Sequence, residues 1–225
     1  MRILPNVEES YAVELVRKSI HLCSLSIPVV YSFAGRSTML WILVPLTLAF
    51  GCSDLLRLLF PAFGTVYMRM FGWLLRPHER NHSRKRLTGA TYVLLSAVLC
   101  IVIFPKVIFI TAFAILIVSD TLAALVGRKY GRVPFLKKSR AGAIAFFLSA
   151  LVVVAVAPKA GYQPIEFMIG LLGALVGTVV ESLSIIVDDN ISIPITIGAT
   201  MWVLYALLLP HIPLFPVVHA VEPAG

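Results

Sequence analysis

Long apolar runs make up most of the chain, and polar residues gather in the short segments between them. A helix needs roughly 20 mostly apolar residues to cross a bilayer. The pattern predicts seven such helices, at residues 17–36, 38–60, 88–105, 106–126, 141–157, 165–187 and 192–210. Because the runs are continuous and do not alternate with polar residues, they exclude a transmembrane β-barrel. The sequence therefore predicts an all-α, polytopic membrane protein whose residues 1–225 form one integral-membrane domain.

The segments outside these helices carry signals of their own. Residues 61–87 begin with Pro61 and place aromatic and methionine side chains around Arg69, a composition that predicts a short helix lying on the membrane surface. The tail at 211–225 contains three prolines, which cannot continue a helix. We expect this tail to be non-helical.

Composition supports a membrane protein and reveals a charge asymmetry. Charged residues make up 13% of the chain and hydrophobic ones 59%, whereas a soluble domain has about 25% charged residues. The net charge is nevertheless +8. With a cytosolic N-terminus, sixteen of the 19 Lys and Arg residues fall on the cytosolic side, and only Arg36, Lys106 and Lys159 fall opposite. The positive-inside rule therefore predicts that the N-terminus is cytosolic, in a multi-pass protein of the cytoplasmic (inner) cell membrane.

Ionisable residues inside the predicted spans are few, and nearly all lie near the cytosolic ends. Asp54, Asp120, Glu181 and His21 stand there, whereas Glu166 alone is at the outer boundary. Such groups are costly in hydrocarbon and mark functional sites. We expect them to converge on one layer, as suits an enzyme with one soluble and one lipid substrate. The non-enzyme alternative, a small-solute transporter, would place polar groups nearer the midplane.

Two groups of polar residues have spacings that suit phosphate chemistry. Glu14, Arg17, Lys18 and His21 share one helix face, either as a surface ion pair with snorkelling cations or as a stripe turned inward towards phosphate. Glu181 precedes Asp188 by two helical turns, roughly 10 Å along the axis. The run Asp188, Asp189 and Asn190 is either a helix-end turn or, with Glu181, part of a site for a hard cation such as Mg²⁺.

Two basic segments lie between the predicted spans. Residues 127–140 contain six cations and no acid, which is either plain positive-inside charge or a cradle where Gly127 and Gly131 let the backbone approach an anion. Residues 76–87 are similarly basic and are expected to touch anionic lipid headgroups. Nucleic acid is not an expected partner, because the cations line a membrane face without interleaved exposed aromatic residues.

Five motifs occur in a characteristic order: Glu14-x-x-Arg17-Lys18-x-x-His21; Leu87-Thr88-Gly89-Ala90-Thr91-Tyr92; Ser119-Asp120-x-x-Ala123-x-x-x-Gly127-Arg128-x-x-Gly131; Lys138-Ser139-x-x-Gly142; and Glu181 followed by Asp188-Asp189-Asn190-x-x-x-Pro194. Over about residues 10–205 the chain resembles the polyprenol kinase family, which includes dolichol kinase, phytol kinase and CTP-dependent diacylglycerol kinase. The resemblance implies CTP-dependent phosphorylation of a membrane lipid alcohol, with Mg²⁺ or Mn²⁺ as cofactor.

The same resemblance implies roles for particular residues. The nucleotide and metal site would contain Asp120, Lys138, Ser139, Gly142, Asp188, Asp189 and Asn190, with Arg17, Lys18 and His21 beside it. Ala141 stands where several members have Glu before the glycine, which favours a prenol acceptor. The related phosphatidate cytidylyltransferases, an alternative, carry a long C-terminal signature that this chain lacks.

These observations combine into one hypothesis for a lipid kinase at the cytosolic membrane face. Phosphoryl transfer needs mainly positioning and neutralisation of charge. We expect Asp120, Asp188 and Asp189 to hold the metal and Glu181 to act as the base or to orient it. The phosphate oxygens would be bound by Gly127, Arg128, Lys129 and Lys138.

Overall fold

The structure, a computed structural model, describes residues 7–75, 79, 86–183 and 187–214. It is helical almost throughout, as predicted, with one small hairpin as the exception among the described residues. The elements in chain order are α1 (Val7–Cys23), α2 (Ser26–Phe33), α3 (Arg36–Leu59), α4 (Pro61–Phe71), α6 (Gly89–Ile103), α7 (Lys106–Tyr130), β1 (Pro134–Phe135), β2 (Lys138–Ser139), α8 (Arg140–Val156), α9 (Pro164–Leu183) and α10 (Asp189–Leu208).

Within the described ranges, four helices are long and apolar enough to cross a membrane: α3, α7, α9 and α10. Two others, α6 and α8, are apolar but shorter, with 15 and 17 residues. The protein is thus an all-α, multi-pass membrane protein, as predicted. The structure supports spanning helices at four of the seven predicted positions by length and composition.

The first predicted span, 17–36, is not one helix. The chain forms α1 and α2, separated at Ser24 and Leu25, whose amides bond to the carbonyls of His21 and Leu22 at 3.0 Å. The cause is Pro28, which has no N–H to donate to Ser24 and whose ring clashes with that carbonyl. The carbonyl of Ser24 instead accepts from Ile27 at 3.0 Å, in a tighter turn.

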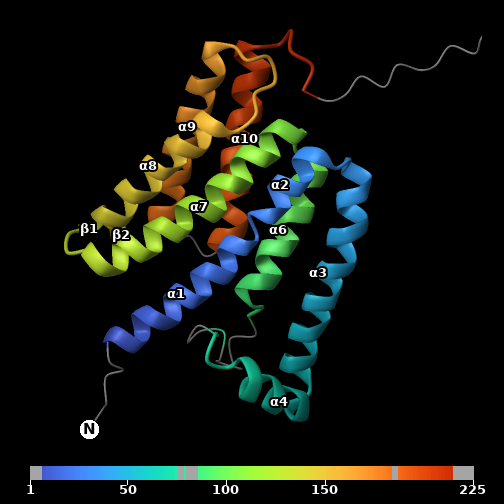
Figure 1. The fold of residues 1–225 in the computed structure, drawn as a ribbon, viewed down its shortest axis with the longest axis vertical. Helices are drawn as coiled ribbons and strands as arrows, with labels where there is room; N and C mark the ends of the chain where they lie inside the picture. Colours follow the sequence, from blue (N-terminus) through green and yellow to red (C-terminus); the bar gives the residue numbers. More distant parts are fainter. Residues whose placement is uncertain (1–6, 76–78, 80–85, 184–186, 215–225) are drawn as a thin grey trace, which may run out of the picture.

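Helix α7 forms the centre of the molecule. Its sequence is apolar on all sides, which favours a helix buried on all sides. In its most apolar stretch of 18 residues, 72% is buried. It packs against α1 and α2 on one side and against α8 and α10 on the other (Figure 1). Most side chains on this helix are therefore packed against other helices, and Asp120 is one of the buried residues.

Helices α3 and α4 form a separate flank. In Figure 1, α3 stands on the side of the molecule away from α8 and α9, and α4 runs across its end. The predicted short helix after Pro61 is confirmed as α4, with the proline at its start, a position where the missing N–H costs nothing. Only four residues of α3 are buried: Met39, Leu43, Asp54 and Arg57.

One buried carboxylate, Glu166, binds the connection between α8 and α9. Glu166, 1% exposed, accepts hydrogen bonds from the amides of Ala160, Gly161 and Gln163 at 2.6–3.0 Å and from the Tyr205 hydroxyl at 2.7 Å. It thereby fixes the α8–α9 connection against α10. Helix α10 ends at Leu208, so the chain leaves the helix where predicted; residues 215–225 lie outside the described part.

Candidate active site

A polar pocket of about 540 Å³ opens where α1, α7, β2, α9 and α10 meet. Residues far apart in sequence come together there. Four are cations and four are carboxylates, and small residues of α7 and α8 complete the wall. The lining residues are Glu14, Arg17, Lys18, Asp120, Ala123, Ala124, Gly127, Arg128, Lys138, Ser139, Gly142, Glu181 and Asp189.

A buried ion pair lies at the base of the polar pocket. The Lys18 ammonium donates to the Asp120 carboxylate, and the two residues are 3% and 8% exposed. His21 Nε2 lies 3.7 Å from the same carboxylate. Both partners come from adjacent helices, α1 and α7. Lys18 of the α1 stripe therefore points into the protein, and its contact with phosphate stays a prediction.

Lys138 bridges two further carboxylates across the pocket. Its Nζ lies 2.8 Å from Glu181 Oε1 and 2.9 Å from Asp189 Oδ2. Burial acts to lower the pKa of Lys138, but the Asp189 and Glu181 carboxylates outweigh it and hold the pKa above its ordinary value of 10.5. The lysine is therefore fully charged at neutral pH. The Lys138 ammonium thus lies between two carboxylates from different helices, Glu181 of α9 and Asp189 of α10.

The β1–β2 hairpin aims Lys138 at this position. Its strands are antiparallel, with Phe135 opposite Lys138, and the amide of Lys137 donates to the Ser182 carbonyl at 3.0 Å, which ties the turn to α9. Leu136 has a φ of 50°, a left-handed conformation that is unfavourable for a residue with a Cβ. The chain holds this strained turn directly beside a pocket residue.

Three glycines make room around Ser139. The Ser139 hydroxyl caps α8 by accepting from the Gly142 amide at 3.2 Å. A Cβ on Gly127 would lie 2.9 Å from that hydroxyl oxygen, and one on Gly142 would lie 3.1 Å from it. A Cβ on Gly131 would meet it as well. These glycines therefore let α7 and the start of α8 approach closely.

The rim of the pocket is a second set of ion pairs. Glu14, 4% exposed, contacts Arg17 on its own helix at 2.5 Å and Arg128 of α7 at 3.3 Å. Arg17 also donates to the Leu74 carbonyl at 2.8 Å. Glu14 was absent from the predicted site, although it stands in the first motif. Its position three residues before Arg17 was the available signal.

Other predicted residues lie elsewhere. His21 and Asn190 line a second cavity instead. Asp188 caps α10, accepting from the amide and side chain of Asn190 at 3.0 and 2.7 Å. Lys129 lies over the ring of Tyr130, with its Nζ 5.3 Å from the ring centre. The expected loop at 127–140 begins later than predicted, because α7 continues to Tyr130.

Asp54 belongs to a separate hydrogen-bond network and does not line the polar pocket. It is 1% exposed and accepts from the amide and hydroxyl of Thr88 at 2.7 and 2.9 Å and from the Thr91 hydroxyl at 2.7 Å. Arg57, 3.3 Å away, donates to the carbonyls of residues 79 and 86. This network anchors the start of α6 to α3. The rest of the basic segment 76–87, at 76–78 and 80–85, lies outside the described residues.

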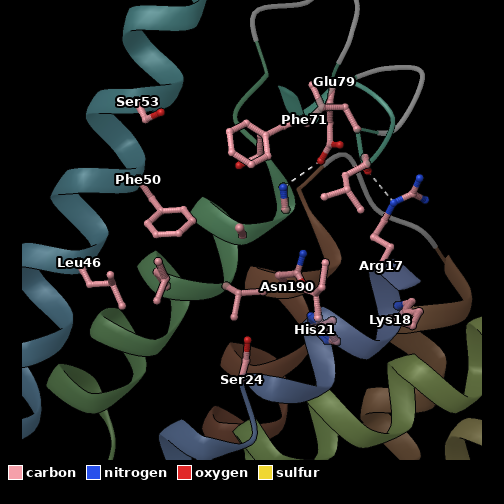
Figure 2. A pocket seen from close by; sticks show the side chains of 18 of the residues that line it. Arg17, Lys18, His21, Ser24, Leu46, Phe50, Ser53, Phe71, Glu79 and Asn190 are labelled. Atoms are coloured by element: carbon pink, nitrogen blue, oxygen red, sulfur yellow. Dashed lines mark hydrogen bonds between the residues drawn. The ribbon is translucent and has the colours of Figure 1, made fainter. Parts of the chain in front are cut away.

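The second cavity, of about 710 Å³, lies between α1, α3, α4 and α6 and is mainly apolar. We call it the apolar cavity. Figure 2 shows Leu46, Phe50 and Ser53 of α3 on one side and Lys18 and His21 of α1 on the other. Sequence reasoning missed it. The motif at Thr88–Tyr92, three of whose residues line it, was the available signal.

Known proteins are similar to this chain over much of its length. An uncharacterized protein of Rickettsia prowazekii is 32% identical over 191 residues, which cover 84% of this chain and 93% of that protein. CTP-dependent diacylglycerol kinase 1 of Saccharomyces cerevisiae is 28% identical over 208 residues, 81% of this chain and 70% of the yeast protein. The chain belongs to the polyprenol and diacylglycerol kinase family.

The family also includes a plant branch. Probable phytol kinase 2 of Glycine max, a chloroplastic protein, is 35% identical over 155 residues, 62% of this chain and 52% of the plant protein. Membership of the kinase family confirms the resemblance drawn from the five motifs. No family model and no solved structure matches this member of the family.

Proposed function

We propose that this protein is a CTP-dependent kinase that phosphorylates the hydroxyl of a membrane lipid alcohol, either a prenol or a diacylglycerol, at the cytosolic face of the cell membrane. The yeast relative is named a CTP-dependent diacylglycerol kinase and the soybean relative a phytol kinase. The carrying observation is the polar pocket, which gathers four cations and four carboxylates in a protein of apolar helices. The sixteen-to-three distribution of Lys and Arg supports a cytosolic N-terminus.

The reaction needs positioning and neutralisation of charge more than covalent help from the protein. The acceptor oxygen forms a bond to the γ-phosphorus of CTP, the bond from that phosphorus to the β,γ-bridging oxygen breaks, and CDP leaves. The hydroxyl proton passes to a carboxylate and then to water. We assign this role to Asp120, which lines both cavities. Glu181 lines the polar pocket but not the second cavity, so we assign it to binding and not to proton transfer.

The phosphate chain would be bound by Arg17, Arg128 and Lys138. Each is partly exposed, with side-chain exposures of 22%, 39% and 28%, and each currently faces a carboxylate. A triphosphate would exchange those carboxylate contacts for phosphate contacts. Arg128 and Arg17 present forked donors suited to phosphate oxygens. Ser139 and the glycines around it let the hairpin pack closely against α7.

The residues fit a divalent cation that accompanies the nucleotide. Among the described residues no three His, Cys, Asp or Glu side chains form a metal-binding group, but Mg²⁺ commonly uses one or two carboxylates together with substrate phosphates. Glu181 and Asp189 both reach a single ammonium group, so they fit Mg²⁺ or Mn²⁺ better than Asp188, which caps α10. The cation would neutralise phosphate charge when bound.

The test uses purified full-length protein in detergent micelles with γ-labelled CTP and either phytol, a polyprenol or dioleoylglycerol. Label should enter an organic-soluble product, and CDP should be released. Release of pyrophosphate would instead identify a cytidylyltransferase and refute the proposal. Label in none of the lipids would also refute it.

Variants link the activity to the pocket. Asp120→Asn should lower kcat by about a hundredfold or more, the scale of a lost proton acceptor. Lys138→Met should raise the KM for CTP, whereas Lys137→Met, the matched control on an exposed neighbour outside the pocket, should behave as wild type. Equal effects of the two lysine variants would contradict the assigned role of Lys138.

A further inference from the structure

The two cavities share a wall. Arg17, Lys18 and Asp120 line both of them, so the buried Lys18–Asp120 pair is reached from the polar side and from the apolar side. His21, which contacts Asp120, and Asn190 face only the apolar cavity. A molecule in the apolar cavity would therefore present its polar end to the pair that the polar pocket also exposes.

The walls of the apolar cavity differ in character. The side formed by α1 carries Lys18 and His21, while α3 contributes Leu46 and Phe50 (Figure 2). Ala49 of α3 and Val93 and Leu94 of α6 extend the apolar wall, and the polar residues Ser53, Glu79 and Thr88 also line the cavity. A volume of about 710 Å³ is within the range of about 300–1,000 Å³ typical of sites for small molecules. An amphiphile with one polar end and a hydrocarbon chain matches this distribution.

Helix α3 is a single layer between this cavity and the bilayer. It is long and apolar enough to span a membrane, yet only 17% of its most apolar 18-residue stretch is buried. Side chains on its other faces, such as Trp41 at 81% and Leu48 at 61%, are exposed. A lipid needs to pass only this layer to reach the cavity, without crossing the central helix α7.

We propose that the apolar cavity binds the hydrocarbon chain of the acceptor alcohol, with the hydroxyl at Lys18, Asp120 and His21 and the chain between α3 and α6. The assignment rests on the proposed kinase function and extends it to a specific lipid subsite. Ala49 of α3 and Ala90 of α6 both line this cavity. Their small side chains leave room for the chain, so they set the bulk of alcohol that the enzyme accepts.

The test replaces these alanines with a large residue. Ala49→Phe and Ala90→Phe should lower kcat/KM for phytol or dioleoylglycerol by about tenfold or more, because a difference of even one methylene in a hydrophobic pocket changes kcat/KM by about this factor. The KM for CTP should stay unchanged, and a short alcohol such as geraniol should be affected less. Ala155→Phe is the matched control: it lies exposed on α8 and lines neither cavity.

A second measurement does not depend on turnover. A photoreactive analogue of phytol with a diazirine at the end of its chain is irradiated with the protein in micelles, and labelled peptides are found by mass spectrometry. Label on α3 and α6 that unlabelled phytol displaces supports the subsite. Label confined to α8, α9 and α10, or loss of CTP affinity in both alanine variants, would overturn it. Failure of the kinase proposal is separate: wild-type protein would then transfer label to no lipid.

Discussion

The packing of Gly127 against Ser139 predicts that Gly127→Ala changes the stability of the protein in opposite directions with and without the Ser139 hydroxyl. A Cβ at residue 127 would lie 2.9 Å from Ser139 Oγ, while its next contact, with Gly142 Cα, would be an ordinary 3.4 Å. In Gly127→Ala, either the helices separate, at about 1–3 kcal/mol for overpacking, or the hydroxyl rotates away and gives up the α8 cap, at about 1 kcal/mol. Against this, alanine within a helix gains up to about 1 kcal/mol over glycine.

Removing the hydroxyl removes the conflict. Ser139→Ala alone should destabilise by about 1 kcal/mol through loss of the cap. In that background, Gly127→Ala should stabilise by up to about 1 kcal/mol, because only the helix gain remains. In the wild-type background, the same change should be neutral to destabilising by about 2 kcal/mol, the overpacking cost less the helix gain. The coupling between the two sites is thus about 1 kcal/mol or more.

The assay is unfolding of the single and double variants in detergent micelles, followed by far-ultraviolet circular dichroism. Gly51→Ala calibrates the helix gain, because a Cβ at Gly51 of α3 meets nothing within 4 Å. Its effect should be the same with Ser139 or Ala at residue 139. If Gly127→Ala changes stability equally in both backgrounds, to within about 0.5 kcal/mol, the steric account of this glycine is wrong.

Three further changes test other parts of the structure. Leu136→Gly should stabilise the protein by up to about 1 kcal/mol, because glycine adopts a positive φ without strain. A lower thermal unfolding temperature than that of wild type would contradict the strained turn. Tyr205→Phe should cost about 1–3 kcal/mol by removing the hydroxyl that donates to Glu166, with kcat unchanged because the pair is remote from both cavities. Since the folded-state pKa of Lys138 is raised above 10.5, its stabilising effect is complete below that pH and is lost as the pH rises through the raised value. The stability difference between wild type and Lys138→Met should therefore be flat from about pH 7 to 9 and shrink above about 10.5, and a decline already at neutral pH would refute the charge state assigned to Lys138.

Sequence patterns located the helices well where one residue class dominates a whole segment. The apolar run that begins at residue 106 predicted α7, because a helix that is apolar on every face can be recognised from its composition alone. The break between α1 and α2 was missed, although Pro28 is visible, because proline is tolerated within many membrane helices. Pro45 and Pro194 show this, since both lie inside helices.

The candidate site was predictable in its residues but not in all their contacts. Lys18, Asp120, Lys138 and Glu181 were each selected by type and position, and the fold brings them together. The choice between Asp188 and Asp189 depends on one helical step at the start of α10, which spacing alone does not resolve. The apolar cavity was missed because residues that face a cavity and residues that face lipid have the same composition, and the Thr88–Tyr92 motif was the one sequence signal at its wall.

The break at Ser24 separates the rotational registers of two neighbouring segments. In a continuous helix, inserting one residue turns everything beyond it by about 100° and would swing one half out of its packing. Here α1 is fixed through Lys18 and α2 through its packing on α7, and the turn at residues 24–25 can absorb a change in length. A residue inserted or deleted at this junction should therefore leave the Lys18–Asp120 pair intact.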